Sequence, residues 1–130
     1  MYKVLLMFSK INKNTNIQTV LGNVEIYLKD FSIAKTIKME IKTIVSEIIY
    51  NIKKYTPSGS LKLKIEKNVL YIHASDHGLG IDDINMAIKD GYSTSGTLGL
   101  GFASLFRLSD EIDIQTSKNG TTINIIKSIV

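Results

Sequence analysis

The chain has 130 residues and a mass of 14.5 kDa, with 44% hydrophobic and 22% charged residues. This size and balance predict one domain over residues 1–130 and exclude a multidomain assembly or a long disordered tail. The chain contains no cysteine, which excludes disulfides, a thiolate nucleophile and cysteine-ligated zinc.

The formal net charge is +4, and Arg107 is the only arginine among 16 basic residues. The lysines are scattered among acidic residues, so the charge does not predict a nucleic-acid partner. The apolar run Met1–Phe8 is too short to span a membrane and lacks a cleavage site of small residues. We therefore expect a cytoplasmic protein with no nucleic-acid and no membrane partner.

The N-terminal third predicts a strand and a helix. Residues Tyr2–Ser9 are apolar enough for a buried strand, and the polar segment Lys10–Asn16 is typical of a loop. Apolar residues then recur at helical spacing over Ile17–Phe31, although Gly22 weakens that pattern.

The strongest helical pattern runs from Ile37 to Tyr55. Its apolar residues recur every three or four positions and form one stripe: Ile37, Ile41, Ile44, Ile48, Ile52 and Tyr55. The sequence Pro57-Ser58-Gly59 should end this helix, because proline disfavours helical geometry in the preceding residue.

Two hairpins are predicted, on either side of a glycine-rich region. Leu61–Ile65 and Val69–Ala74 form the first, and Ile112–Ser117 and Thr121–Val130 form the second, across an Asn-Gly turn signal. Between them, residues 76–101 carry six of the nine glycines. We expect a short helix from Asp82 to Asp90 inside that region and a further helix over Phe102–Leu108. Together these elements predict a mixed α/β fold.

Three segments carry candidate chemistry. On the long helix, Glu47 and Asn51 stand four residues apart and share one face at the border of the isoleucine stripe. A carboxylate and an amide at that spacing can serve a hydrated Mg²⁺ and a nearby nucleophile, whereas the alternative is ordinary helix-surface polarity.

The second segment is Asp76-His77-Gly78-Leu79-Gly80, directly after an apolar strand. Its glycines would let the backbone approach a flat ligand, and Asp76 could accept a hydrogen bond from an amine. A plain strand-to-helix turn is the alternative.

The third segment is Ser93-Thr94-Ser95-Gly96-Thr97-Leu98-Gly99-Leu100-Gly101, which opens a helix. Backbone N–H groups at a helix N-terminus favour phosphate. The segment is not a P-loop, because no Gly-Lys-Ser/Thr follows, and it is not a dinucleotide fingerprint, because its glycines are at the wrong spacing.

In this order, and followed by Gly120-Thr121-Thr122, the three segments resemble the GHKL ATPase superfamily over about Ile37 to Ile126. Asp90-Gly91-Tyr92-Ser93-Thr94 and Arg107-Leu108-Ser109-Asp110-Glu111 are most similar to the RsbT-type switch kinases and anti-sigma factor kinases. The resemblance implies a Bergerat-type two-layer α/β sandwich, in which helices cover one face of a mixed, mainly antiparallel sheet. Only fifteen residues separate Gly80 from Gly96, which leaves little room for a long lid.

The resemblance also implies roles for the matching positions, with ATP and Mg²⁺ as cofactors. Glu47 would orient or deprotonate the attacking hydroxyl, and Asn51 would hold Mg²⁺. Asp76 would accept from the exocyclic amine of adenine, with Thr121 assisting through water. The remaining contacts to the base and the phosphates would come from Gly78, Gly80, Ser93, Thr94, Gly96, Thr97, Leu98, Gly99, Leu100 and Gly101.

The implied activity is that of a protein serine/threonine kinase whose substrate is a STAS-domain protein. A sigma factor or a PPM-type phosphatase is a further candidate partner, and a homodimer is left open. The alternative function is a nucleotide-gated binding module, either an anti-sigma factor or a phosphatase activator, that transfers little or no phosphate.

Overall fold

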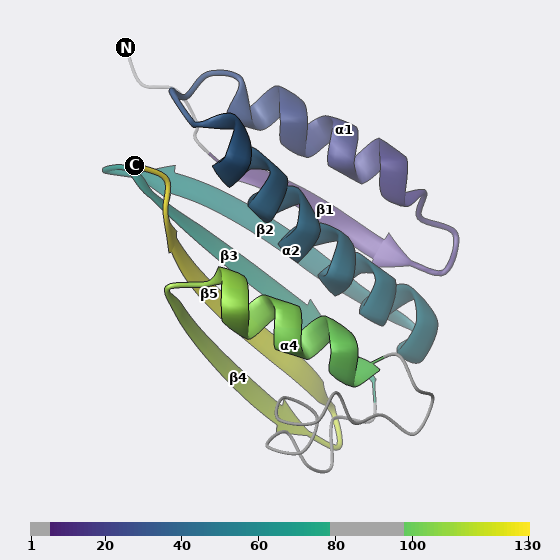
Figure 1. Ribbon diagram of the computed structural model, residues 1–130. Coiled ribbons are helices and arrows are strands. Elements are labelled where there is room, and N and C mark those ends of the chain that lie inside the picture. The colour runs from purple at the N-terminus through teal and green to yellow at the C-terminus, as the bar shows by residue number, and fades with distance from the viewer. Residues whose placement is uncertain (1–5, 79–97) are drawn as a thin grey trace.

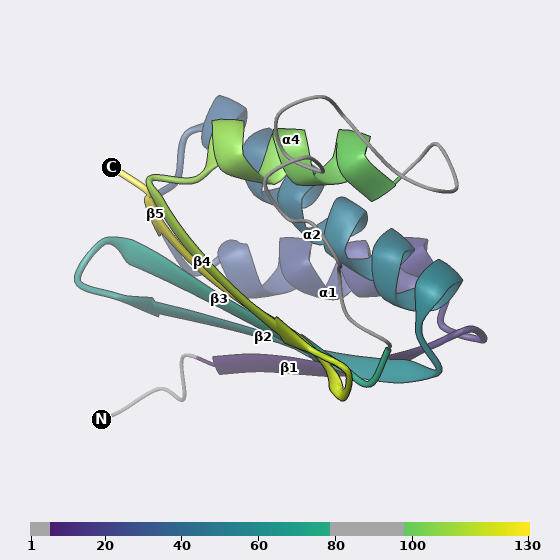
Figure 2. The same ribbon diagram turned by 90° about the horizontal axis from the view of Figure 1, so that it is seen from below.

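A computed structural model describes residues 6–78 and 98–130 of the chain, with side chains at residues 6–78 and 103–130. The elements are β1 (Leu6–Asn12), α1 (Ile17–Leu28), α2 (Lys35–Tyr55), β2 (Ser58–Glu66), β3 (Val69–Asp76), α4 (Leu98–Leu108), β4 (Glu111–Ser117) and β5 (Gly120–Ser128). They form two layers, a sheet and a set of helices on one of its faces (Figures 1 and 2).

The sheet has five strands in the order β1-β2-β3-β5-β4, and the four neighbouring pairs are all antiparallel. The two hairpins occupy adjacent places, so the central pairing joins β3 to β5. Helix α2 lies between α1 and α4 across this sheet (Figure 1). The predicted sandwich with a mainly antiparallel sheet covered on one face is therefore confirmed.

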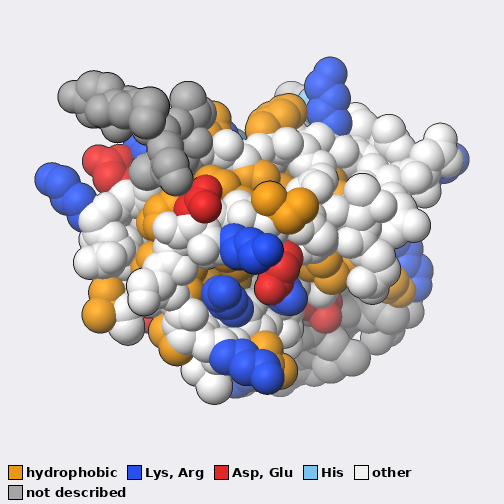
Figure 3. Space-filling model, turned by 90° about the horizontal axis from the view of Figure 1, so that it is seen from above, with side chains coloured by type: hydrophobic (Ala, Val, Ile, Leu, Met, Phe, Trp, Pro, Cys, Tyr) orange, Lys and Arg blue, Asp and Glu red, His pale blue; other side chains and the backbone are white. Residues whose placement is uncertain are grey.

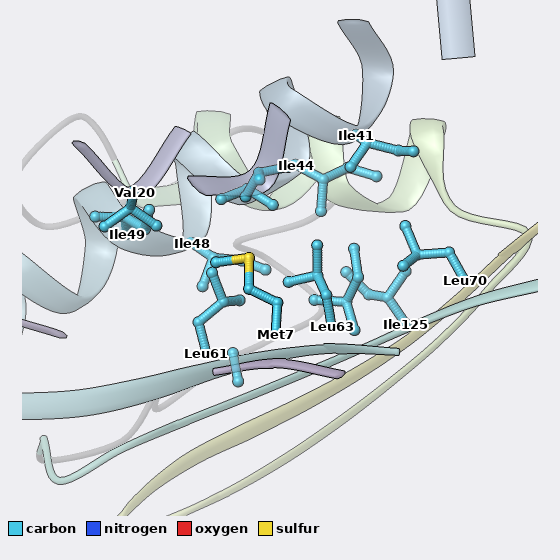
Figure 4. Close-up of a cluster of buried hydrophobic side chains, with 14 of the residues drawn as sticks. Met7, Val20, Ile41, Ile44, Ile48, Ile49, Leu61, Leu63, Leu70 and Ile125 are labelled. Atoms are coloured by element: carbon cyan, nitrogen blue, oxygen red, sulfur yellow. The ribbon is translucent and has the colours of Figure 1, made fainter. Parts of the chain in front are cut away.

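The core lies between the two layers, where side chains from α2 point toward side chains from the sheet (Figure 4). The α2 stripe is buried at Ile41, Ile44, Ile48 and Ile52. Alternate strand residues meet it, because successive side chains of a strand point to opposite faces. Fully burying one such side chain contributes about 1.5–3 kcal/mol. The burial of the α2 stripe against the sheet therefore stabilises the alignment of the two layers.

Two predicted boundaries in the N-terminal third are wrong. Strand β1 extends to Asn12, into the predicted loop Lys10–Asn16, because Ile11 is 1% exposed and pairs with Gly59. Helix α1 ends at Leu28 rather than Phe31. Its N-terminus is capped by Asn16, whose side chain accepts a hydrogen bond from the N–H of Thr19 at 3.2 Å.

The first hairpin turns at Lys67 and Asn68, as predicted. Both residues have positive φ, 52° and 64°, which suits the two-residue turn of a right-twisted hairpin. Strand β2 begins at Ser58, however, so two residues of the predicted Pro57-Ser58-Gly59 turn already belong to the sheet. The predicted short helix from Asp82 to Asp90 lies outside the described residues.

Charged side chains of both signs lie beside one another on the side of the molecule that is uppermost in Figure 1, where α1 lies (Figure 3). One ion pair on α2 is partly buried: Lys127 of β5 contacts Glu40 at 3.0 Å, and its Nζ also donates to the carbonyl of Leu108 at 2.6 Å. Among the helices in the described ranges, none is long and apolar enough to cross a bilayer.

Candidate functional site

The described site residues gather at the end of the molecule where α2 ends. Strand β3 also ends there, β5 begins there, and α4 begins on the same side (Figure 1). The candidate chemistry of the sequence thus comes from four elements whose ends meet. The fold brings residues as far apart in the sequence as Glu47 and Thr121 to one edge of the two-layer sandwich.

Glu47 and Asn51 lie on the C-terminal half of α2, and both are half-buried. The amide nitrogen and oxygen of Asn51 are buried, and neither has a hydrogen-bond partner among the residues that the structure describes. A buried amide without partners is costly, because it loses its bonds to water. Asn51 is therefore the side chain in this region most in need of a ligand.

Asp76 is the last residue of β3, on the strand face that carries buried Ala74 and Ile72. Its Oδ1 accepts two backbone hydrogen bonds, from Gly78 at 2.9 Å and from Thr121 at 3.1 Å. Oδ2 takes part in neither. The two N–H donors hold the carboxylate in one orientation. Its Oδ2 is the atom that can accept a hydrogen bond from a ligand.

Thr121 is the second residue of the neighbouring strand β5 and is 5% exposed. Its hydroxyl lies 2.9 Å from the hydroxyl of Thr116, across the β4–β5 hairpin. The adjacent Gly120 has a φ of 141°, and a Cβ there would lie 2.0 Å from the carbonyl oxygen of Asp76. Only glycine lets β5 start this close to the end of β3, and this approach brings the Thr121 N–H to Asp76.

The N-terminus of α4 differs from the expected arrangement. The helix begins at Leu98, so Leu98, Gly99, Leu100 and Gly101 form its first turn instead of a loop before it. The first four N–H groups of an α-helix have no partner within the helix, and they carry the positive end of the helix dipole. These four positions therefore keep the N–H groups that a phosphate needs.

Five predicted site residues lie outside the described residues: Gly80, Ser93, Thr94, Gly96 and Thr97. Besides the four in α4, the described ones are Glu47 and Asn51 in the C-terminal half of α2, Asp76 at the end of β3, Gly78 just after it, and Thr121 near the start of β5.

Lys54 is a residue of this region that the motifs did not single out. It lies three residues after Asn51, so the two share a helical face, and its Nζ donates to the hydroxyl of Tyr50 at 3.1 Å. That hydrogen bond raises the pKa of Lys54 above its ordinary value, and the nearby rings of Tyr50 and Tyr55 also favour the cation. The sequence signal that could have identified Lys54 is its position one helical turn after Asn51.

Comparison with known proteins gives concordant matches. The model of the family described as histidine kinase-, DNA gyrase B-, and HSP90-like ATPase matches residues 36–128. Serine/threonine-protein kinase RsbT of Bacillus subtilis (strain 168) is 36% identical over 104 residues, which cover 76% of this chain and 78% of that protein. Anti-sigma F factor of Bacillus licheniformis is 34% identical over 100 residues, covering 69% of this chain and 68% of that protein.

Solved structures share the fold at lower identity. The structure of the RsbU and RsbW domains of Rv1364c from Mycobacterium tuberculosis superposes with a TM-score of 0.65 at 14% identity, covering 95% of this chain and 32% of that one. The catalytic domain of histidine kinase ThkA superposes with a TM-score of 0.58 at 16% identity, covering 95% and 96% of the two chains. These likenesses concern the arrangement of helices and strands.

Proposed function

Because the chain belongs to the family of histidine kinase-, DNA gyrase B-, and HSP90-like ATPases, we propose that it is an ATP-dependent protein serine/threonine kinase of the partner-switching type. Its substrate in this proposal is a hydroxyl group of a STAS-domain protein. The single observation that carries the proposal is the buried amide of Asn51, which has no partner in the described part of the chain and lies one turn from Glu47.

Different residues bind the base and the phosphates of the nucleotide. Asp76 accepts a hydrogen bond from the exocyclic amine of adenine through Oδ2, since Oδ1 is held by Gly78 and Thr121. The N–H groups at the start of α4 face the phosphates, where the helix dipole favours negative charge. Lys54 adds a positive charge to the face of α2 that carries Asn51. The predicted base contact of Gly80 and the predicted phosphate contacts of Ser93, Thr94, Gly96 and Thr97 complete this assignment.

A divalent cation fits the donor set of this site. Amide and phosphate oxygens are ligands that Mg²⁺ accepts while it keeps several waters, and the Oδ1 of Asn51 is the buried oxygen without a partner in the described residues. When bound, Mg²⁺ would neutralise charge on the phosphates. Asn51 would hold it.

Glu47 acts on the acceptor. Its carboxylate accepts the hydrogen of the serine or threonine hydroxyl as the oxygen attacks the γ-phosphorus, and the bond between that phosphorus and the β–γ bridging oxygen breaks to leave ADP. In this proposal the carboxylate, one turn before Asn51 on α2, acts at the phosphate end of the nucleotide instead of the base end. The reaction therefore needs a partner that presents its hydroxyl at this edge.

The experiment combines the purified chain with labelled ATP, Mg²⁺ and the STAS-domain protein encoded nearest to its gene. We expect phosphoserine or phosphothreonine on the partner, and we expect Glu47→Gln to abolish transfer while ATP still binds. Glu66→Gln is the matched control, because Glu66 is an exposed carboxylate at the far end of β2 and pairs with Lys64. Absence of phosphorylated partner with wild type, or transfer by Glu47→Gln at the wild-type rate, would contradict the proposal.

The similarity to anti-sigma F factor supports a second candidate, a nucleotide-gated binding module. Its partner would be a sigma factor or a PPM-type phosphatase, and the nucleotide would shape the surface that the partner reads. Capture of these partners in ATP, in ADP and without nucleotide separates the two functions. Binding that needs nucleotide but not the γ-phosphate, together with no phosphate transfer, supports the module; turnover of ATP on the STAS protein supports the kinase.

A further inference from the structure

The start of β2, just after the end of α2, is hydrogen-bonded to the turn that follows Asp76. The backbone N–H of His77 donates to the carbonyl of Ser58 at 3.0 Å, and the Ser58 hydroxyl lies 3.1 Å from Nδ1 of His77. The β2–β3 register places Gly59 opposite Asp76. The first residues of β2 thus connect the helix that bears Asn51 to the turn after β3.

Thr56 is the residue on which these contacts converge. Its hydroxyl lies 2.9 Å from the carbonyl oxygen of Ile52 and 3.2 Å from that of Ser58, so its one hydrogen is shared between the helix and the strand. Its methyl group covers Gly78, because a Cβ on Gly78 would lie 2.7 Å from Cγ2 of Thr56. One side chain therefore touches the last turn of α2, the start of β2 and the turn after β3.

The end of α2 and the β2–β3 pair are closely packed beneath Thr56. A Cβ on Gly59 would lie 2.5 Å from the carbonyl oxygen of Ser75 and 3.0 Å from Cγ2 of Ile52. Ile52, the neighbour of Asn51 in sequence, is thus packed against the β2–β3 pair just before Asp76. A shift of the helix end would move the backbone on which the Asp76 carboxylate is held.

We propose that Thr56, with Ser58, is a positioning residue that fixes Asp76 relative to Asn51 and thereby sets the preference of the site for adenine over guanine nucleotides. This inference rests on the proposed nucleotide site. Adenine presents an amine at the position where guanine presents a carbonyl oxygen, so a carboxylate accepts from the first and repels the second. That discrimination requires a carboxylate fixed with respect to the phosphates, because a carboxylate that can move aside no longer rejects the wrong base.

The test measures ADP and GDP binding with Mg²⁺ by calorimetry in wild type and Thr56→Val, which keeps the methyl-bearing shape and removes the hydroxyl. We expect the preference for ADP over GDP to fall by about fivefold, the factor that corresponds to one net hydrogen bond. Thr56→Ser, which keeps the hydroxyl, should retain the wild-type preference. The matched control is Thr43→Val, because the Thr43 hydroxyl bonds the carbonyl of Met39 at 3.0 Å on an exposed part of the same helix.

The steady-state constants KM and kcat distinguish a positioning role of Thr56 from a merely structural one. We expect Thr56→Val to raise the KM for ATP while kcat at saturating ATP stays close to wild type, since Glu47 and Asn51 are untouched. If Thr56→Val fails to fold, Ser58→Ala serves instead, because it removes only the hydroxyl beside His77. An unchanged preference for ADP in the folded variant would overturn the inference, whatever its stability.

A second pair of variants tests the methyl contact. Gly78→Ala should weaken ADP binding, since its Cβ meets Cγ2 of Thr56, and Thr56→Ser in the same chain should restore part of the affinity. No recovery would contradict the contact. The proposed function fails separately: a wild type that binds neither nucleotide rejects the site itself, whereas one that binds ADP without phosphorylating any partner rejects only the kinase.

Discussion

The amide group of Asn51 is buried without a hydrogen-bond partner in the described ranges, and this arrangement destabilises the folded chain in the absence of ligand. The cost of such a group is about 1–3 kcal/mol. Ile48 and Ile52, beside Asn51 on α2, are packed into the core, so an apolar side chain would suit the fold better at position 51. Stability and ligand binding therefore favour different residues at this position.

Asn51→Leu should accordingly raise the free energy of unfolding of the ligand-free chain by about 1 kcal/mol, because a buried amide is replaced by an apolar group of similar volume. The same variant should lose the rise in Tm that wild type shows with ATP and Mg²⁺. Urea denaturation and thermal denaturation measure the two effects. A variant that is less stable than wild type and still responds to ATP would show that the amide has a structural partner instead.

Lys127 is an inward-facing lysine of β5 whose side chain is 8% exposed. It occupies a position where the alternation of the strand favours an apolar residue, and it ties β5 to Glu40 of α2 and to the last carbonyl of α4. Lysine near the C-terminus of a helix also complements the helix dipole. This one residue thus helps to hold α4 at the end opposite to its first turn.

Breaking the pair on one side should cost more than replacing both members. Glu40→Gln leaves the Lys127 ammonium nearly buried without a counter-charge and should lower the free energy of unfolding by about 1–3 kcal/mol. The double variant Glu40→Gln with Lys127→Met should recover a large part of that loss, as measured by urea denaturation. A double variant less stable than Glu40→Gln alone would show that the bond from Lys127 to Leu108 matters more than the ion pair.

Two glycines in regular elements should respond oppositely to alanine. Gly22 lies exposed inside α1, with open space around its Cα, and Gly22→Ala should raise the free energy of unfolding by about 0.5–1 kcal/mol. Gly120→Ala should lower it by about 2 kcal/mol or more, since a positive φ is strained for alanine and its Cβ would collide with the carbonyl of Asp76. Thermal denaturation of both variants checks the contrast; equal effects would contradict the close approach of β5 to β3.

For the molecule as a whole, nucleotide binding adds directly to stability. A ligand at 100 times its Kd that binds only the folded chain stabilises it by about 2.7 kcal/mol. We expect ATP with Mg²⁺ to raise Tm accordingly, and EDTA to remove most of that rise, because in the proposed site the cation links the phosphates to Asn51. An Asn51→Leu control should show neither effect. A rise in Tm that EDTA leaves unchanged would contradict the assignment of Asn51 as the magnesium residue.

Much of the fold follows from local patterns in the sequence. The isoleucine stripe of α2, the alternation in β2 and the low polarity of β3 predicted those elements, because each buries a face in the core. The end of β1 was wrong, since the burial of Ile11 depends on its pairing with Gly59, a residue 48 positions away. The start of α4 was also wrong, because glycines weaken the helical signal in its first turn.

The sequence predicted the positions of some candidate site residues but not the contacts between them. Glu47 and Asn51 could be placed on one helical face by counting residues, and Asp76 could be placed at the end of a strand. The role of Thr56 could not be read from the sequence, because its contacts with Gly78 and Ser58 depend on how the end of α2 meets the sheet. Lys127 was missed for the same reason: its partners come from two helices that are distant in the sequence.

The order β1-β2-β3-β5-β4 has a consequence for how the chain can change in evolution. Each hairpin closes over two residues, whereas the β3–β5 pairing closes a loop of 43 residues, from 77 to 119. The entropy of closing a long loop rises only with the logarithm of its length, so doubling the loop costs about 0.6 kcal/mol. Insertions and deletions between β3 and β5 can therefore change the binding properties of relatives. The two hairpins continue to determine the pairing of the sheet.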